Sequence, residues 1–197
     1  MIIVTGGPGT GKSYTAAKIE EMTEGLTKLS YDAVKEKNWD TFGFDNKKQK
    51  EALNGFALEE FYLYVRKAMR ASGTLLLEYP FYQYHKPRLE ELAKEYGYNV
   101  ITVYLYGDSK TVYERSVKRD HGGKRHPGHL TDCYHKEEYS EEEPAAVDAV
   151  PDYEGFCRWM RERNYNIGLG HTIAVDVTDF TRIDYEELIK EIRLRSE

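Results

Sequence analysis

Gly6-Gly7-Pro8-Gly9-Thr10-Gly11-Lys12-Ser13 fits the phosphate-binding pattern G-x-x-x-x-G-K-[ST] at each of its fixed positions. Its flanks have the character that this pattern requires. Residues 1–4 are an apolar run rich in β-branched side chains, which predicts a buried strand. Residues 14–22 place small and apolar side chains among charged ones, which predicts a helix. Strand, glycine loop and helix together predict a site for the phosphates of a nucleoside triphosphate.

The chemistry of this loop follows from its residue types. Glycines let the backbone turn successive N–H groups inward around a phosphate, and the helix N-terminus adds partial positive charge. Lys12 is expected to reach the β- and γ-phosphates, and the Ser13 hydroxyl is expected to ligate Mg²⁺. The predicted cofactors are therefore ATP and Mg²⁺. The residues predicted to bind the nucleotide are Gly6, Gly7, Pro8, Gly9, Thr10, Gly11, Lys12, Ser13 and Tyr14.

Length and composition limit the remaining possibilities. The chain has 197 residues, of which 40% are hydrophobic and 31% charged, so we expect one globular domain over residues 1–197. A net charge of −6 gives no support to broad nucleic-acid binding. Two cysteines make no disulfide framework, which favours a reducing cytoplasm. Because the first residues form a core strand and no apolar run approaches ~18 residues, we expect neither a signal peptide nor a membrane span.

The rest of the chain alternates strand-like and helix-like patterns, which predicts an α/β fold with a parallel sheet covered on both faces. Further strands are predicted at 26–30, 74–78, 100–105 and 172–177, and further helices at 47–71, 88–96, 109–119, 152–164 and 185–194. Residues 35–46 and 80–86 are predicted to be loops. Residues 120–150 carry several Gly and Pro and a run of Glu, and connections of this length are usually lids or disordered. We expect a helical or irregular lid insertion there.

Two acidic residues are predicted at the carboxyl ends of strands, where open parallel sheets bind ligands. Asp32 could position or activate an acceptor hydroxyl, or it could be a turn or N-cap residue. Glu78 closes an apolar run in the manner of a Walker B acid. It could hold Mg²⁺ through water, hydrogen-bond the acceptor, or form a structural salt bridge.

Two arginines precede the predicted lid. Arg115 and Arg119 are four residues apart and so share one face of their helix. Arginines that close over a triphosphate stabilise charge and stack on a base, although a solvated basic helix end is the simpler alternative. Inside the lid, the histidines and Cys133 raise the possibility of zinc, but no paired CxxC spacing supports it.

With these residues in place, the chain resembles the small P-loop kinases, and most closely the group of polynucleotide 5′-kinases, chloramphenicol phosphotransferase and zeta toxins. The similar stretches are residues 6–13, Ser30-Tyr31-Asp32-Ala33-Val34-Lys35, Leu75-Leu76-Leu77-Glu78, Glu114-Arg115-x-x-x-Arg119 and Val175-Asp176-Val177-Thr178. The resemblance implies a three-layer P-loop NTPase fold with sheet order 2-3-1-4-5.

The resemblance also implies roles for individual residues. Asp32 would activate the acceptor hydroxyl, Arg119 and Arg115 would be lid arginines, and the segment after Thr178 would border the adenine. Lys35 stands where many relatives carry an Arg that touches the acceptor's phosphate. That difference weakens bidentate phosphate recognition. The lid is also longer and more acidic than in the simple pattern.

The function expected from the sequence is transfer of the γ-phosphoryl group of ATP to a hydroxyl of a small molecule. Three alternatives stay open. A polynucleotide 5′-hydroxyl kinase would be favoured by a basic stripe beside the acceptor cleft. A nucleotide-dependent switch or ATPase should lack an acceptor cavity and would not need Asp32. A nucleoside monophosphate kinase is the third. The aromatic residues after residue 78 could wall an acceptor pocket or pack in the core: Tyr79, Phe81, Tyr82 and Tyr84.

Overall fold

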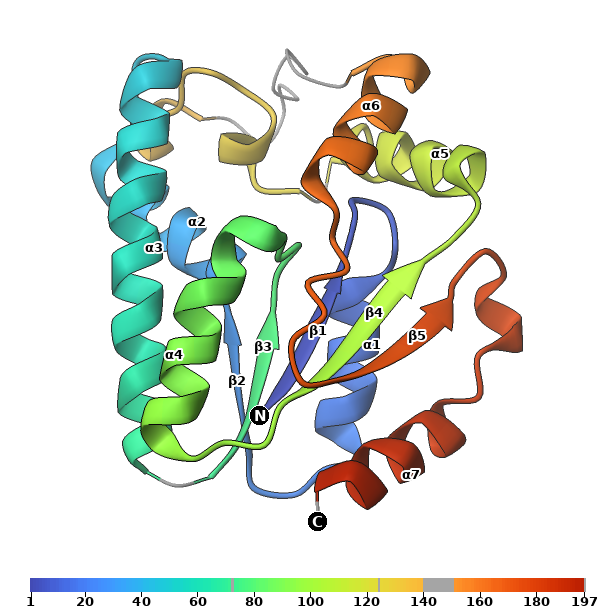
Figure 1. Cartoon of the computed structure of the whole chain (residues 1–197). Helices are drawn as coiled ribbons and strands as arrows, with labels where there is room; N and C mark the ends of the chain where they lie inside the picture. The colour runs from blue at the N-terminus through green and yellow to red at the C-terminus, as the bar shows by residue number, and fades with distance from the viewer. Residues whose placement is uncertain (72, 124, 140–150, 197) are drawn as a thin grey trace.

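The protein is described by a computed structural model, which places residues 1–71, 73–123, 125–139 and 151–196. Its centre is a parallel sheet of five strands in the order β2-β3-β1-β4-β5 (Figure 1). This order confirms the one predicted. The strands are β1 (Ile2–Gly6), β2 (Leu26–Ser30), β3 (Thr74–Glu78), β4 (Ile101–Tyr106) and β5 (His171–Asp176).

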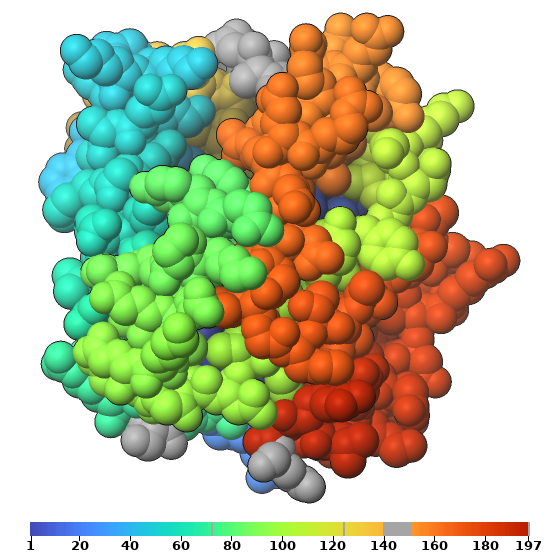
Figure 2. Space-filling view, viewed as in Figure 1, coloured from blue at the N-terminus to red at the C-terminus, as the bar shows by residue number. Residues whose placement is uncertain are grey.

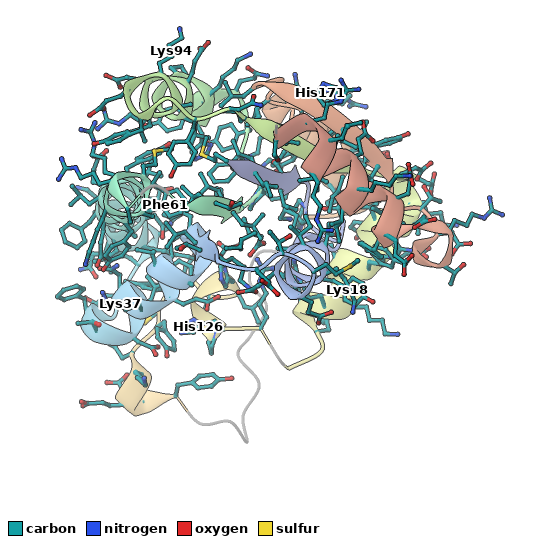
Figure 3. The ribbon with its side chains drawn as sticks, turned by 90° about the horizontal axis from the view of Figure 1, so that it is seen from below. Lys18, Lys37, Phe61, Lys94, His126 and His171 are labelled. Carbon is teal, nitrogen blue, oxygen red and sulfur yellow. The ribbon has the colours of Figure 1, made fainter. Side chains whose placement is uncertain are left out.

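Helices cover both faces of the sheet, which gives the three layers of the predicted fold class. Figures 1 and 3 show α3 and α4 on one face, with α1 and α7 on the other. Helices α5 and α6 lie beyond the carboxyl ends of the strands, at the top of Figure 1. The helices are α1 (Lys12–Glu21), α2 (Tyr31–Phe42), α3 (Lys47–Arg70), α4 (Lys86–Tyr96), α5 (Ser109–Asp120), α6 (Tyr153–Arg163) and α7 (Tyr185–Ser196).

The central strands are buried on both faces, which is why they appear in the sequence as continuous apolar runs. Because successive side chains of a strand point to opposite faces, Ile3 packs with the α3 residue Phe61. Its neighbour Val4 packs on the other face with Ile19 of α1. Burying a side chain of this size contributes about 1.5–3 kcal/mol. The two apolar layers fix the sheet and therefore the position of every loop at its carboxyl edge.

Residues 165–169, which we call the cover segment, lie over one face of the sheet without forming a strand or a helix. Figures 1 and 2 show this orange chain descending from α6 between α4 and α5. Its odd-numbered side chains are buried and its even-numbered ones exposed, as in a half-buried strand. The buried Thr102 Oγ1 donates to Leu169 O (2.6 Å), and the buried Thr5 Oγ1, which donates to Phe81 O (2.8 Å), lies 3.4 Å from Tyr165 O.

The predicted loop at 35–46 is wrong over most of its length, because α2 continues to Phe42 and ends at Gly43, whose φ is +64°. The buried positions of α2 follow helical spacing: Tyr31, Val34, Lys35, Asn38 and Trp39. Two of these five side chains are polar, which hides the helical periodicity from a hydrophobicity pattern. Asn38 is accommodated because its Nδ2 donates to Val34 O (2.9 Å) and to Glu60 Oε2 (2.7 Å).

Residues 125–139, which we call the lid segment, dock on α2 and on the start of α3. Two short 3₁₀ turns shape the segment, at Pro127–His129 and Lys136–Glu138. An isolated antiparallel bridge joins Phe44 to Tyr134, and both rings pack with Trp39 in a third, small apolar core. The remainder of the predicted lid, residues 140–150 with Glu141–Glu143, lies outside the described residues, as does Lys124. None of the helices within the described ranges is long and apolar enough to cross a membrane.

Candidate functional site

The phosphate loop, residues 6–13, has the backbone that the glycines were predicted to allow. Gly9 (φ +82°) and Gly11 (φ +79°) occupy the left-handed region. A Cβ on Gly9 would lie 2.2 Å from the carbonyl oxygen of Val112 in α5, and one on Gly11 would lie 2.8 Å from the ring of Phe180. The loop is thus pressed between two neighbouring segments. A side chain at either position would change both the backbone and this packing.

The Lys12 side chain folds back onto the backbone of the phosphate loop. Its Nζ donates to the carbonyl oxygen of Gly7 (2.9 Å), and only 8% of the residue is exposed. Burial lowers the pKa of Lys12 to about 8, although the carboxylates of Glu78 and Asp32 favour the charged form. The ammonium group is therefore still mostly protonated at neutral pH, and it lies within the predicted phosphate loop.

Ser13 and Glu78 meet at the carboxyl end of β3. Ser13 Oγ donates to Glu78 Oε1 (3.2 Å), and Glu78 is 7% exposed. Burial raises the pKa of Glu78, and the negative charge of Asp32 raises it further, while Lys12 acts in the opposite direction. A hydroxyl and a carboxylate side by side are oxygen donors of the kind that Mg²⁺ binds in phosphate sites. The pair fits the predicted metal site.

Asp32 lies in the first turn of α2, and its nearest charge is Lys35. Lys35 Nζ is 2.5 Å from Asp32 Oδ1 and only 8% of Lys35 is exposed. Three aromatic rings surround this ammonium, with centroids 5.1 Å (Tyr31), 5.5 Å (Trp39) and 5.0 Å (Tyr79) away. Lys35, which the resemblance assigned to an acceptor phosphate, points at Asp32 instead.

This arrangement keeps Asp32 ionised. Burial alone would raise the pKa of Asp32, but the charges of Lys35, His129 and Lys12 outweigh it and lower that pKa to about 2. About a third of the side chain, 31%, stays exposed to a ligand. Asp32 is thus a weak base at neutral pH but a good hydrogen-bond acceptor.

Arg119 and Arg125 converge on one carboxylate. Arg119 Nε donates to Asp120 Oδ1 (2.8 Å), Arg125 Nη1 donates to the same oxygen, and the Asp120 side chain is 10% exposed. Burial opposes ionisation of Asp120, but the two arginines outweigh it and lower its pKa. Sequence reasoning assigned no role to Arg125 or Asp120. The only signal for them was the basic character of the residues that follow α5.

Arg115 is placed differently from Arg119, although the two share a helix face as predicted. Its guanidinium lies 4.0 Å from the centroid of the Phe180 ring. Its nitrogens donate to the carbonyl oxygens of Val177 (2.5 Å) and Thr178 (2.8 Å). Arg115 therefore ties α5 to the segment after β5, and the Phe180 ring beneath it packs against Gly11 of the phosphate loop.

Two cavities adjoin at these residues. A cavity of about 320 Å³ lies over the phosphate loop and is bounded by Arg115 and Phe180. A second, of about 560 Å³, lies between α2 and the lid segment. Four residues line both of them: Ser13, Asp32, Glu78 and Arg119. Four of the six side chains predicted to be catalytic or metal-binding thus stand where the cavity over the phosphate loop (the phosphate-side cavity) meets the cavity beside the lid segment (the acceptor-side cavity, named for its predicted role). A third cavity, of about 680 Å³, is larger but lies between β5 and α7, away from the phosphate loop.

The lid histidines pair with separate carboxylates on or near α2. The three contacts are His126 Nε2 to Asp40 Oδ1 (2.9 Å), His129 Nε2 to Glu36 Oε1 (2.8 Å) and His135 Nε2 to Asp45 Oδ1 (2.8 Å). Across the described part of the chain, no three or more His, Cys, Asp or Glu residues are grouped so that they could hold a metal ion. The histidines fasten the lid segment to α2.

The aromatic residues after β3 do not line either of the two adjoining cavities. Phe81 is fully buried in the core beside α3, and Tyr79 packs against that core while facing Lys35. Tyr84 is 68% exposed. Of the two interpretations of this aromatic group, core packing describes Phe81 and Tyr79.

Comparison with protein families finds a match between residues 2–145 and the model of the AAA domain. A search of curated proteins finds no match.

Solved structures with the same fold cover nearly the whole chain. A candidate kinase of Chloroflexus aurantiacus J-10-fl is similar with 21% identity and a TM-score of 0.73, over 98% of this chain and 93% of that one. A gluconokinase of Sinorhizobium meliloti 1021 is similar with 15% identity and a TM-score of 0.54 (98% and 89%). The tunicamycin resistance protein of Deinococcus radiodurans is similar with 16% identity and a TM-score of 0.54 (98% and 94%). At these identities the likeness shows a shared fold.

Proposed function

This chain belongs to the AAA domain family, and we propose that it is an ATP-dependent kinase that transfers the γ-phosphoryl group of ATP to a hydroxyl group of a small molecule. The observation that carries the proposal is the pair of adjoining cavities that share Ser13, Asp32, Glu78 and Arg119. A kinase must bring a nucleotide and an acceptor to one point. A nucleotide-dependent switch needs only the first cavity.

The phosphate-side cavity supplies the groups that bind ATP. Backbone N–H groups of the loop and the N-terminus of α1 face the phosphates, and Lys12 adds a mobile charge. Ser13 and Glu78 would hold Mg²⁺, and the bound ion would offset the negative charge of the β- and γ-phosphates. Arg115 and Phe180, joined at the outer wall of this cavity, would border the base.

Asp32 faces the acceptor. We assign it the role of accepting a hydrogen bond from the reacting hydroxyl, which orients the oxygen toward the γ-phosphorus. The acceptor oxygen then bonds to phosphorus, the bond from phosphorus to the β–γ bridging oxygen breaks, and ADP leaves. The hydroxyl proton passes to Asp32 and from there to water. Because this transition state is largely dissociative, a carboxylate of low pKa suffices as the positioning group.

Arg119 and Arg125 stabilise the charge that develops on the transferred group. Asp120 holds both guanidinium groups at the junction of the cavities, so their position is set before the reaction. Each guanidinium has five N–H donors, and the contacts to Asp120 leave others for phosphoryl oxygens. Lys35 acts on Asp32 and not on the acceptor.

The charges around the acceptor-side cavity favour a small acceptor over a polynucleotide. Its walls carry Asp32, Glu36 and Glu78 besides the two arginines, which is not the basic stripe that a nucleic acid would favour. The finer grouping with zeta toxins and chloramphenicol phosphotransferase rests on the motifs quoted above. From the content of two cysteines we also propose a reducing cytoplasm as the location of the protein.

The test is a transfer assay with γ-labelled ATP and Mg²⁺ across polyols, sugars, nucleosides, antibiotics and 5′-hydroxyl oligonucleotides. We expect label on at least one small hydroxylated compound, and none with Lys12→Ala. Lys18→Ala, on the exposed side of the same helix, is the matched control and should keep the wild-type rate. Hydrolysis of ATP with no labelled acceptor in any class would overturn the proposal and favour the switch. Labelled oligonucleotide ends alone would favour the polynucleotide kinase.

A further inference from the structure

We infer that the acceptor is a small uncharged polyol, with its reacting hydroxyl on Asp32 and the hydroxyl of the neighbouring carbon on Glu36. This inference rests on the proposed kinase function and names its substrate class. It is drawn from the walls of the acceptor-side cavity, from the spacing of two carboxylates on α2, and from the partners of the charges around them.

The walls of this cavity are polar almost throughout. Of its ten lining residues, Ala33 alone has an apolar side chain. Pockets for aromatic or drug-like ligands are lined mainly by apolar and aromatic side chains. Among its lining residues the only rings are the imidazoles of His126 and His129, each bonded to a carboxylate, and no Phe, Tyr or Trp offers a face on which a nucleobase or an aromatic antibiotic could stack. A ligand rich in hydroxyl groups matches such walls.

Two carboxylates of α2 line this cavity from the same face of the helix. Asp32 and Glu36 are four residues apart on α2 and so lie side by side on one face of the helix. His129, whose side chain is 8% exposed, places Nε2 at 2.8 Å from Glu36 Oε1. Because an ionised carboxylate only accepts hydrogen bonds, Nε2 carries the proton in this contact. Glu36 is thus held in place while 37% of its side chain stays exposed, with acceptor capacity left for a ligand.

The charged groups around the cavity already have protein partners, although Arg119 and Arg125 share a single carboxylate. Lys35 pairs with Asp32, and Asp120 pairs with Arg119 and Arg125. Burial lowers the pKa of His129, which favours the neutral form of the imidazole beside Glu36. Because Lys35 already neutralises Asp32, the site does not need a cationic acceptor. An anionic acceptor would be repelled by Glu36 and Glu78. An uncharged ligand that donates hydrogen bonds fits best.

The first experiment compares four acceptors that share one six-carbon skeleton, with glycerol and adenosine added for size and aromaticity. Transfer from γ-labelled ATP is measured on glycerol, D-glucitol and D-glucose, on the anion D-gluconate, on the cation D-glucosamine, and on adenosine. We expect kcat/KM for at least one uncharged polyol to exceed every charged or aromatic acceptor by about tenfold or more, the worth of one hydrogen bond to a charged group. A preferred anion, cation or nucleoside would overturn the inference and leave the kinase function standing. No transfer to any acceptor class would overturn the function itself.

The second experiment assigns the contact to Glu36. NMR locates the phosphorylated carbon, and the analogue that lacks the hydroxyl on the adjacent carbon is then compared in wild type and in Glu36→Ala. We expect each change alone to raise the acceptor KM about tenfold and the two together to cost no more than either one. The KM for ATP should not change. Glu36→Gln, which can still accept from His129, should fall between wild type and Glu36→Ala.

A matched control is Glu59→Gln, an exposed carboxylate on α3, which should behave as wild type. Equal losses with the deoxy analogue in wild type and in Glu36→Ala would contradict the assignment of that hydroxyl to Glu36. A thermal melt of Glu36→Ala separates loss of the contact from loss of the fold: an unchanged melting temperature with a raised acceptor KM supports the contact.

Discussion

The phosphate loop and the lid segment reach the same active-site junction by opposite means. The phosphate loop is formed by eight consecutive residues whose own backbone shapes the site, with Lys12 bonded to Gly7 within it. The lid segment is held by residues far away along the chain. Asp40 alone accepts from His126 Nε2 (2.9 Å), Tyr134 Oη (2.7 Å) and Lys136 Nζ (2.7 Å).

The difference shows what a local motif determines and what it leaves open. Glycine positions decide the shape of the phosphate loop, so it can be recognised in any chain that carries it. The lid segment owes its place to pairs of histidine and carboxylate that become neighbours only after folding. The shape of the phosphate loop therefore follows from its sequence motif. The arrangement of the lid segment depends instead on contacts that are particular to this chain. The following changes test that division.

Lys12→Ala should have the largest effect. It removes the charge directed at the β- and γ-phosphates, so we expect transfer to fall by about 10³-fold or more and ATP binding to weaken strongly. Calorimetry with a non-hydrolysable ATP analogue measures the binding, and labelled ATP measures the transfer. Retained transfer would show that the loop does not hold the reacting phosphates.

Asp32→Asn should distinguish the roles of the two cavities in transfer and in ATP binding. The amide keeps the size of the side chain but loses its charge, so we expect transfer to fall by about 10²-fold while ATP affinity stays near wild type. The same two measurements apply. If ATP affinity falls in parallel with transfer, Asp32 belongs to the nucleotide or metal site and the division between the cavities fails.

Lys35→Met should change the pH dependence of kcat more than it changes the maximum value of kcat. Lys35 is the first of the charges that lower the pKa of Asp32, so its removal raises that pKa. Asp32 acts when ionised, which is at pH values above its pKa. The acid limb of the kcat profile should thus move to higher pH, by about one to three pH units, and activity should be lost earlier on acidification. Lys35→Arg should restore part of the wild-type profile. Identical profiles for all three proteins would exclude this coupling.

Gly128→Ala should have the smallest effect on turnover and act on stability instead. A Cβ at Gly128 would lie 2.4 Å from Cε3 of the buried Trp39 ring, so the lid segment must shift on α2. We expect a loss of about 1–3 kcal/mol in unfolding free energy, with ATP affinity unchanged. Gly55→Ala is the control, because its Cβ meets nothing within 4 Å in the middle of α3. That change should stabilise the protein by about 0.5–1 kcal/mol. Weaker ATP binding in Gly128→Ala would show that the lid segment and the phosphate loop are coupled.

Much of the fold could be predicted because the strands are apolar runs between clear turn signals. The order of the strands came from the resemblance and is confirmed. Helix α2 was missed because Lys35 and Asn38 lie on its buried face, where apolar residues are expected in a helical hydrophobicity pattern.

The site was partly predictable for the same kind of reason. Positions that follow from the loop motif or from the end of a strand, such as Ser13 and Glu78, were found, and the structure brings them together at 3.2 Å. Residues that act through a partner distant in sequence were not found. Glu36 is held by His129, which is 93 residues away in sequence, and Arg125 pairs with Asp120 across a turn for which the sequence gives no pattern. A single sequence carries no record of such pairs.

The cover segment shows that a stretch without regular secondary structure can be as intolerant of length changes as a strand. Surface connections usually accept insertions and deletions freely. Here the Thr102 hydroxyl anchors the segment at the Leu169 carbonyl, the side chains of Tyr165, Ile167 and Leu169 are buried, and the residues between them face solvent. One residue more or fewer would break this anchor or turn Ile167 outward. Among homologous chains, residues 165–169 should therefore keep their length while the neighbouring lid varies in size.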